Sequence, residues 1–461
     1  MAGVTTPDRH SASAEPGPPD LFLIGQVLTP DGLAERMVTV RDGLIFAVEP
    51  ATAARPGRAG RLVELAADEV LIPGLVDTHV HVNEPGRTEW EGFATATRAA
   101  LAGGVTTLVD MPLNSIPATT SLAALRTKRA AASGQCRVDV GFWAGAVPDS
   151  LGHLAELDEA GVFGFKCFLV DSGVAEFPPL SAGQLRTAMT EIAAFDGLLI
   201  VHAEDPQVIA AHARPHTVHY GEFLDSRPPS AETAAIDTVI AAARATGCRT
   251  HIVHLSSAEA LPAIRAARAD GVRLTVETCP HYLTLVAEDI GDGQTQFKCC
   301  PPVRDAANAD QLWQALTEGV IDLVVSDHSP STPDLKLLDT GDFGAAWGGI
   351  SSLQLGLALV WTEGRRRGHD LPRVVDWMAT RTADLIGVAG KGRIEVGCSA
   401  DLVVFAPDEQ HTIDARSLQH RHAVTPYHGR TLTGVVRSTY LRGEPIEVGG
   451  APRGDLLQHR K

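Results

Sequence analysis

Several signals of membrane and secreted proteins are absent from this 461-residue sequence. It has no run of about 18 consecutive apolar residues, which a membrane-spanning helix needs. Its N-terminal stretch lacks the basic segment followed by an apolar segment that marks a secretory signal. These absences predict a cytoplasmic protein, and we expect residues 1–19 to form a disordered leader.

Cysteine is scarce, and its spacing carries little information. The seven cysteines are scattered without any C-x-x-C pair, which argues against a disulfide framework and against a thiolate zinc site. Cys299 and Cys300 are adjacent, a pattern that redox chemistry could use, but we expect all seven to be reduced packing residues.

Positively charged residues are also few: the chain has 39 Lys and Arg against 56 Asp and Glu, which gives a net charge of −17. Such a chain repels phosphate backbones and anionic lipids, so nucleic-acid binding and membrane-surface binding are disfavoured. The hydrophobic fraction of 44% is ordinary for a globular protein with a large core. The length suits one large domain with a smaller companion.

Short runs of Val, Ile, Leu and Phe alternate with alanine-rich segments, the pattern of strand–helix units around a parallel sheet. There are eight such runs, and their spacing predicts a (β/α)8, TIM-type barrel. We expect the barrel to occupy residues 71–390. The runs are Leu71–His81, Val105–Asp110, Val138–Trp143, Val162–Leu169, Leu198–His202, Thr250–His254, Leu274–Glu277 and Ile321–Asp327.

The segments that flank the barrel contain short apolar runs separated by turn-like sequences such as Pro-Asp-Gly. We therefore expect residues 20–70 and 391–450 to build one small β-sandwich domain from both chain ends. Residues 451–461 are expected to be a frayed tail. Inside the barrel, Thr88 and Ser181 have the pattern of helix N-caps, each followed three residues later by Glu or Gln.

Metal-ligand residue types stand at the ends of four barrel runs. His79 and His81 are two residues apart, so on a strand both imidazoles face one point. A lone His-x-His pair also suits two hydrogen-bonded histidines. However, three further runs end on His202, His254 and Asp327. Because barrel active sites lie at the C-terminal ends of the strands, this repetition predicts a shared metal site.

The fourth run carries Lys166 among apolar residues. A lysine in such a position can extend its ammonium group to solvent, since buried lysines are rare without a partner. An ammonium group has no lone pair for a metal ion. If the nitrogen captures carbon dioxide as a carbamate, the side chain becomes an anionic ligand with two oxygens, and both interpretations stay open at this point.

Together with longer motifs, these residues resemble the binuclear site of the cyclic amidohydrolases, which include dihydroorotases, hydantoinases, dihydropyrimidinases and allantoinases. The resemblance spans roughly residues 20–445, and the motifs are most similar to those of the allantoinase branch. The motifs are His81–Phe93, Asp110–Thr119, Glu277–Leu283, Lys298–Arg304, Ser326–Pro330, Ala346–Ile350 and Lys391–Phe405.

The resemblance implies two divalent metal ions per subunit. Nitrogen and oxygen ligands suit Zn²⁺ best, although iron, cobalt and manganese accept the same ligands. A hydroxide that bridges the ions would attack the ring amide, with Asp327 as general acid and base. By resemblance, the first ion is held by His79, His81 and Asp327, the second by His202 and His254, and both by N6-carboxylated Lys166.

The substrate implied by the resemblance is allantoin, a neutral ureido-hydantoin that is opened to allantoate in purine catabolism. Similar enzymes that open the anionic dihydroorotate carry Arg two residues after the His-x-His pair, where this chain has Asn83. Dihydroorotate is therefore disfavoured. The residues expected to contact the substrate are Asn114, Cys279, Ser329 and Trp347.

Other polar residues near these motifs are expected to support the site. We interpret Arg87 and Arg304 as partners in structural ion pairs. His281 and His328 are expected to orient metal ligands. Ser331 stands where many similar allantoinases have Cys.

Two alternative functions stay open from the sequence. The first is another cyclic amidase of the hydantoinase or dihydropyrimidinase type. The second is a non-catalytic scaffold, because a fold by itself does not prove activity; the complete ligand set argues against it. The resemblance also implies a homo-oligomer, either a tetramer or a dimer.

Overall fold

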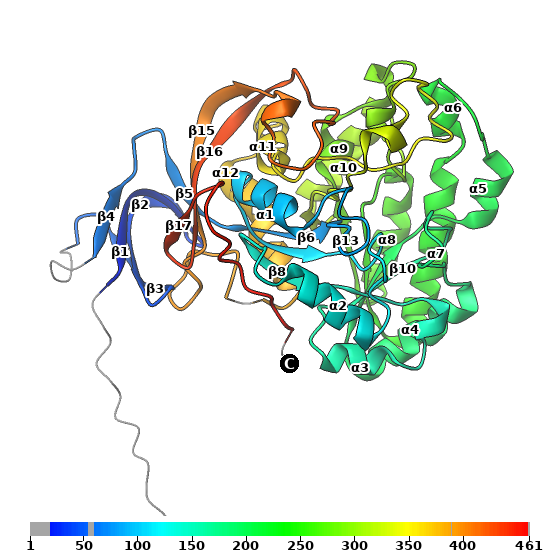
Figure 1. The fold of residues 1–461 in the computed structure, drawn as a ribbon, viewed down its shortest axis with the longest axis horizontal. Coiled ribbons are helices and arrows are strands. Elements are labelled where there is room, and N and C mark those ends of the chain that lie inside the picture. The colour runs from blue at the N-terminus through cyan, green and yellow to red at the C-terminus, as the bar shows by residue number, and fades with distance from the viewer. Residues whose placement is uncertain (1–18, 54–59, 389, 460–461) are drawn as a thin grey trace, which may run out of the picture.

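The computed structural model describes residues 19–53, 60–388 and 390–459, and the leader expected at residues 1–19 falls almost wholly outside them. A parallel barrel occupies the middle of the chain (Figure 1). Its strands are buried almost throughout, as expected for runs covered on both faces, with Arg249 and Thr275 partly exposed. They are β6 (Leu75–Val80), β7 (Val105–Asp110), β8 (Asp139–Phe142), β9 (Ala144–Gly145), β10 (Phe165–Phe168), β11 (Leu198–His202), β12 (Arg249–Ile252), β13 (Leu274–Thr278) and β14 (Leu323–Val324).

The barrel closes at two places where the strand ladder is interrupted. β8 and β9 are two parts of one strand separated by Trp143, so the strands occupy eight positions within the described residues. The other closure joins the first and last positions, where Val80 and His328 form a parallel bridge. There the His81 N–H donates to the His328 carbonyl at 2.8 Å. The predicted (β/α)8 barrel is confirmed.

Helices surround the barrel, and their buried faces are rich in Ala, Leu, Ile and Val (Figure 1). None of the helices in the described ranges is both long and apolar enough to cross a membrane. They are α1 (Phe93–Ala102), α2 (Leu122–Ala132), α3 (Leu154–Glu159), α4 (Ala182–Ala194), α5 (Pro206–His212), α6 (Tyr220–Asp225), α7 (Pro229–Thr246), α8 (Leu261–Ala269), α9 (Pro280–Thr284), α10 (Ala306–Thr317), α11 (Gly356–Arg366), α12 (Leu371–Val375) and α13 (Arg381–Leu385).

One of the two predicted helix caps is correct. Ser181 caps α4, and Gln184 completes the capping box. The cap predicted at Thr88 is wrong, because α1 starts later, after Gly92. Glu91, which would have completed that box, is instead fully buried and contacts His328 at 3.3 Å.

The chain ends meet in a second sheet beside the barrel, seen as blue and orange-red strands in Figure 1. β5 pairs with both β1 and β15, so the N-terminal and C-terminal strands join into one eight-stranded sheet rather than two separate sheets. Its strands are β1 (Leu21–Thr29), β2 (Gly32–Arg41), β3 (Leu44–Pro50), β4 (Arg61–Glu64), β5 (Val70–Pro73), β15 (Leu402–Thr412), β16 (Thr431–Leu441) and β17 (Glu444–Ile446).

Gly74 marks the point where the chain passes from this sheet into the barrel. It separates β5 from β6, so the run predicted over Leu71–His81 belongs to two sheets. A Cβ atom at Gly74 would lie 2.2 Å from Thr106 Oγ1. Only glycine allows this close approach of the backbone to β7.

The C-terminal segment is not frayed within the described residues. Leu456 forms a parallel bridge with Val140 in β8. The Val140 N–H donates to the Asp455 carbonyl at 2.9 Å, and the Leu457 N–H donates to the Val140 carbonyl at 2.8 Å. The tail therefore extends the hydrogen bonding of β8, which composition alone did not indicate.

Candidate metal centre and substrate cavity

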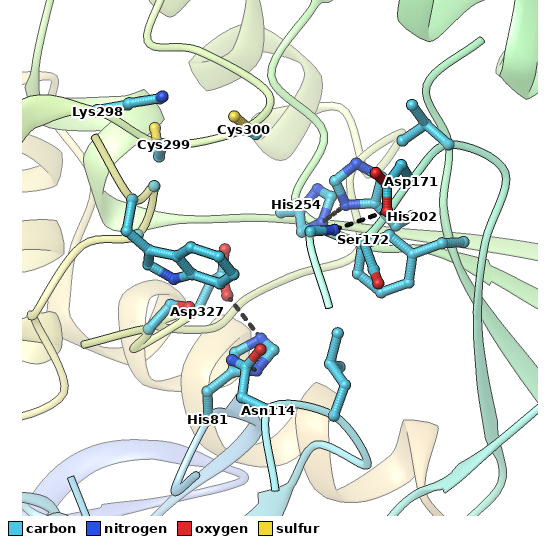
Figure 2. A pocket seen from close by; sticks show the side chains of 18 of the residues that line it. His81, Asn114, Asp171, Ser172, His202, His254, Lys298, Cys299, Cys300 and Asp327 are labelled. Carbon is cyan, nitrogen blue, oxygen red and sulfur yellow. Dashed lines mark hydrogen bonds and ion pairs between the residues drawn. The ribbon is translucent and has the colours of Figure 1, made fainter. Parts of the chain in front are cut away.

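Five barrel strands place the predicted ligands at the same end of the barrel. His79 lies in β6, Lys166 in β10 and His202 at the end of β11, while His254 and Asp327 follow β12 and β14. Figure 2 shows His81, His202, His254 and Asp327 around one cavity. His254 and Asp327 have φ values of 40° and 43°, so the chain turns sharply where each strand ends. The C-terminal end of the barrel gathers all six residues.

The first half of this cluster is centred on Asp327. Its Oδ1 atom lies 3.2 Å from His79 Nε2 and 3.5 Å from His81 Nε2. One ligand atom from each of the three residues lies within 4.8 Å of the others. His79 Nε2 is buried without a hydrogen-bond partner in the described part of the chain. An orphaned imidazole nitrogen beside a carboxylate fits a bound cation.

The second half is formed by His202 and His254. His202 Nδ1 faces His254 Nε2 at 2.9 Å. Both imidazoles are buried, and burial together with nearby positive charges lowers the pKa of each. Neutral imidazoles are the form that binds metal ions. Two of them with nitrogens turned to each other fit a shared cation.

Buried glutamates hold two of these imidazoles from behind. Glu277 Oε1 accepts a hydrogen bond from His79 Nδ1 at 2.5 Å, which leaves Nε2 facing the cluster. Glu204 Oε2 lies 2.8 Å from His202 Nε2, which leaves Nδ1 facing the cluster. Carboxylates in this position fix the tautomer and orientation of a metal-binding histidine.

Glu277 also organises other residues behind the site. Its second oxygen lies 2.9 Å from His251 Nε2, and its first accepts the His254 backbone N–H at 3.2 Å. Glu277 stands in one of the motifs recognised in the sequence, but its contacts with two histidines could not be predicted from that motif. Glu204 carried no signal of its own beyond its place two residues after His202.

Lys166 lies inside the site and does not reach solvent. Its side chain is buried and lines the cavity above the cluster. The nitrogen lies 5.1 Å from the centre of the Phe168 ring. Burial lowers the pKa of Lys166 to about 8, against the opposing charges of Asp327 and Glu277. With a pKa of about 8, roughly a tenth of this amine is neutral at pH 7, far more than for an ordinary lysine, and the neutral form is a nucleophile.

Asp327 is an anion in this environment. Burial by itself would raise the pKa of its carboxyl group, but the electrostatic interaction with His79 and the hydrogen bond from His81 lower it well below the usual value. The His81 imidazole shows the opposite balance, since burial lowers its pKa to about 4 despite its contact with Asp327. The site therefore combines one carboxylate with imidazoles of lowered pKa at His81, His202 and His254, a donor set suited to divalent ions.

A cavity of about 240 Å³ opens over these ligands. Asn114, Ser329 and Trp347, all predicted to contact the substrate, line it. Cys279 does not belong to its wall; this residue is fully buried, beside Asp327 and His281. The sequence analysis missed several other polar residues of the wall, which come from loops far apart in the chain: Asp171, Ser172, Arg227, Lys298, Cys299 and Cys300.

The two arginines form the structural ion pairs expected of them, whereas the hydrogen bonds of the His328 ring within the described residues reach no proposed metal ligand. Arg87 forms an ion pair with Glu176, and Arg304 forms a buried pair with Glu232 at 2.7 Å. His328 follows Asp327 directly, and its Nδ1 accepts the backbone N–H of Ser352 at 3.2 Å.

His281 differs from these residues. Neither of its ring nitrogens has a hydrogen-bond partner among the described residues, although His281 lies beside Asp327. Ser331 is also buried, and its hydroxyl has no partner in the described ranges.

A strand–helix barrel with imidazoles and a carboxylate at its C-terminal end is the architecture of a metal-dependent hydrolase. The model of the Amidohydrolase family matches residues 70–446, more than half of the chain. The chain belongs to the amidohydrolase family.

Proteins named allantoinase are similar to this chain over most of its length. One from Streptomyces avermitilis is 58% identical over 435 residues, covering 94% of this chain and 97% of that protein. One from Arabidopsis thaliana is 42% identical, covering 91% of this chain and 86% of that protein.

A similar solved structure is the L-hydantoinase (dihydropyrimidinase) from Arthrobacter aurescens. It has a TM-score of 0.89 and 28% identity, and the match covers 96% of this chain and all of that one.

Proposed function

We propose that this chain is an allantoinase, which hydrolyses the ring amide of allantoin to give allantoate in purine catabolism. The observation that carries the proposal is the 58% identity to an allantoinase that matches along almost the whole of both chains. The cluster of imidazoles, lysine and carboxylate below a cavity of small-molecule size supports hydrolysis as the reaction.

The proposed cofactor is a pair of divalent ions, most simply Zn²⁺. When bound, the ions would polarise the substrate carbonyl and lower the pKa of a coordinated water from 15.7 towards about 7. The orphaned Nε2 of His79 and the facing nitrogens of His202 and His254 support such a centre. The second carboxylate expected in it comes from Lys166.

Carboxylation of Lys166 is part of the proposal. The lowered pKa of its amine favours attack on carbon dioxide, which forms a C–N bond and releases one proton. The resulting carbamate is an anion in a buried position, so it needs cations beside it. Two metal ions would supply that charge.

Asp327 is the proposed general acid and base. Its carboxylate lies at the centre of the cluster and faces the cavity, so it can take a proton from the attacking water. The same group can return that proton to the ring nitrogen when the C–N bond breaks. Asn114, Ser329 and Trp347 are the proposed contacts that orient the ring.

The proposed cellular location is the cytoplasm, and the state of the cysteines supports it. All seven cysteines are free, which suits a reducing compartment such as the cytoplasm. We further propose a homo-oligomer, a tetramer or a dimer, which light scattering of the purified protein would test.

The first experiment compares allantoin with hydantoin, dihydrouracil and dihydroorotate after loading with zinc and bicarbonate. Metal content is measured on the same sample, and Asp327→Asn is the control for catalysis by the site. Preferred opening of allantoin with about two ions per chain is the expected result. Preference for another ring would replace allantoin with a hydantoinase-type substrate. A metal-free, inactive protein would favour the alternative that the chain is a non-catalytic scaffold.

A further inference from the structure

His202 is held from outside the ligand cluster by two charged residues in series. Its Nε2 lies 2.8 Å from Glu204 Oε2, and the same oxygen accepts a hydrogen bond from Arg227 Nη1 at 2.5 Å. Glu204 is fully buried. Its other oxygen, Oε1, has no hydrogen-bond partner within the described residues. Arg227 therefore fixes the one carboxylate oxygen that His202 uses.

This contact determines which nitrogen of His202 faces the centre. A carboxylate accepts hydrogen bonds, so the bond to Glu204 requires the proton on Nε2 and leaves the lone pair on Nδ1. Nδ1 is the atom that faces His254 Nε2 at 2.9 Å. Without Glu204, the ring could rotate or take the other tautomer, and either change would remove the lone pair from the centre.

The other half of the site does not depend on a single contact in this way. Glu277 holds His79, but it is itself fixed by His251 and by the backbone N–H of His254. Asp327 also lies against His79 and His81 directly. On the His202 side, in the described part of the chain, Arg227 is the hydrogen-bond partner that anchors Glu204.

We propose that Glu204 and Arg227 are positioning residues that keep His202 ready to bind one of the two metal ions. This inference rests on the proposed two-metal site and deepens it by assigning the orientation of one ligand to a buried ion pair. Because the pair contacts His202 alone among the ligands, its loss should affect one ion and spare the other.

The test measures metal affinity by chelator competition, with metal content as a readout separate from turnover. Glu204→Ala and Arg227→Met should each lower the affinity for one of the two ions by roughly 10-fold to 100-fold. About one ion per chain should then remain after dialysis. Arg227→Lys restores a cation beside Glu204 and should recover part of the affinity. Glu204→Gln keeps the shape of the side chain and tests the charge, should Glu204→Ala fold poorly.

Two controls separate this role from general stability. Lys391→Met removes the cation of another buried ion pair, with Asp139 at 2.8 Å at the opposite end of the barrel, and should lower stability while two ions stay bound. Adding Glu204→Ala to His202→Ala should cause no further metal loss, because both changes act on the same ion.

Three results would overturn the inference. If Glu204→Ala binds both ions as tightly as the wild type, Glu204 does not position His202. If Arg227→Met changes only KM and not metal affinity, Arg227 contacts the substrate instead, as its place in the cavity wall allows. If the wild-type chain itself fails to bind two ions after loading, the proposed centre fails and this inference with it.

Discussion

At the scale of single residues, Lys166 is the sharpest test of the metal centre. Lys166→Ala removes the proposed carbamate bridge, so we expect the loss of metal and of turnover by at least about 100-fold, comparable to losing a ligand. The barrel should stay folded, since the buried stem of one side chain contributes only about 2–5 kcal/mol. Metal analysis, an activity assay and circular dichroism on the same preparation measure the three outcomes.

A second buried lysine provides the control for Lys166. Lys336 is equally buried, but its ammonium group donates to the Trp347 carbonyl at 3.1 Å and to the Gly349 carbonyl, away from the ligands. Lys336→Met should keep its metal. A Lys166→Ala protein with normal metal content and normal turnover would rule out the bridging role.

The positions of the proposed ligands could be predicted because His81, His202 and Asp327 end runs of apolar residues. A strand that stops on His or Asp in a barrel has one place to put that side chain, the C-terminal end. Glu204 and Glu277 could not be assigned in the same way, since their roles depend on which imidazole nitrogen they face. That geometry appears only when β11 and β13 are placed beside their neighbours.

At the scale of elements, the loop that carries Trp347 depends on two buried lysines. Lys336 holds the carbonyls of Trp347 and Gly349, and Lys298 holds those of Gly344 and Ala346. This loop forms one wall of the cavity above the proposed metal centre. The ammonium groups thus act as structural bridges between carbonyls that a strand or helix would otherwise satisfy.

Lys336 should make stability depend on pH. Burial lowers the pKa of Lys336 to about 7, from 10.5 in the unfolded chain. Between these values the unfolded state binds more protons, so the contribution of Lys336 to stability rises with pH from about 7 upwards, by at most about 1.4 kcal/mol per unit. Urea unfolding of wild type and Lys336→Met at several pH values measures the difference. Parallel curves would contradict this assignment.

Elements were predictable where burial on both faces gives a continuous apolar run, as in β11. Elements could not be predicted where a single residue determines to which sheet a strand belongs. Gly74 splits one apolar run between the two sheets, because backbone packing against Thr106 excludes a side chain. The wall of the cavity was missed for a related reason: Asp171, Arg227 and Lys298 lie on loops whose meeting is set by the barrel.

At the scale of the whole molecule, the C-terminal residues connect the eight-stranded sheet to the base of the barrel. Asp139, at the start of β8, accepts hydrogen bonds from Lys391, Arg442 and the Asp455 backbone N–H. Lys391 also pairs with Asp401, beside β15. Charges from the C-terminal part of the chain therefore converge on Asp139 under the barrel, opposite the proposed metal centre, where barrels are built for stability.

The tail should contribute to stability without affecting catalysis, and two glycines allow a matched test. A Cβ atom at Gly454 would lie 1.9 Å from the Val138 carbonyl oxygen, whereas one at Gly449 would meet nothing within 4 Å. Gly454→Ala must displace the tail or strain it, so we expect a loss of roughly 1–3 kcal/mol and a lower Tm. Gly449→Ala should change stability little.

Digestion by a carboxypeptidase distinguishes a displaced tail from a strained one. A displaced tail in Gly454→Ala would be trimmed faster than in Gly449→Ala, while metal content and kcat stay at the wild-type level because the site lies at the other end of the barrel. Equal melting temperatures and equal trimming in the two variants would mean that the hydrogen bonds to β8 do not hold the tail in solution. A fall in kcat with intact metal would instead show that the base of the barrel is coupled to the reaction.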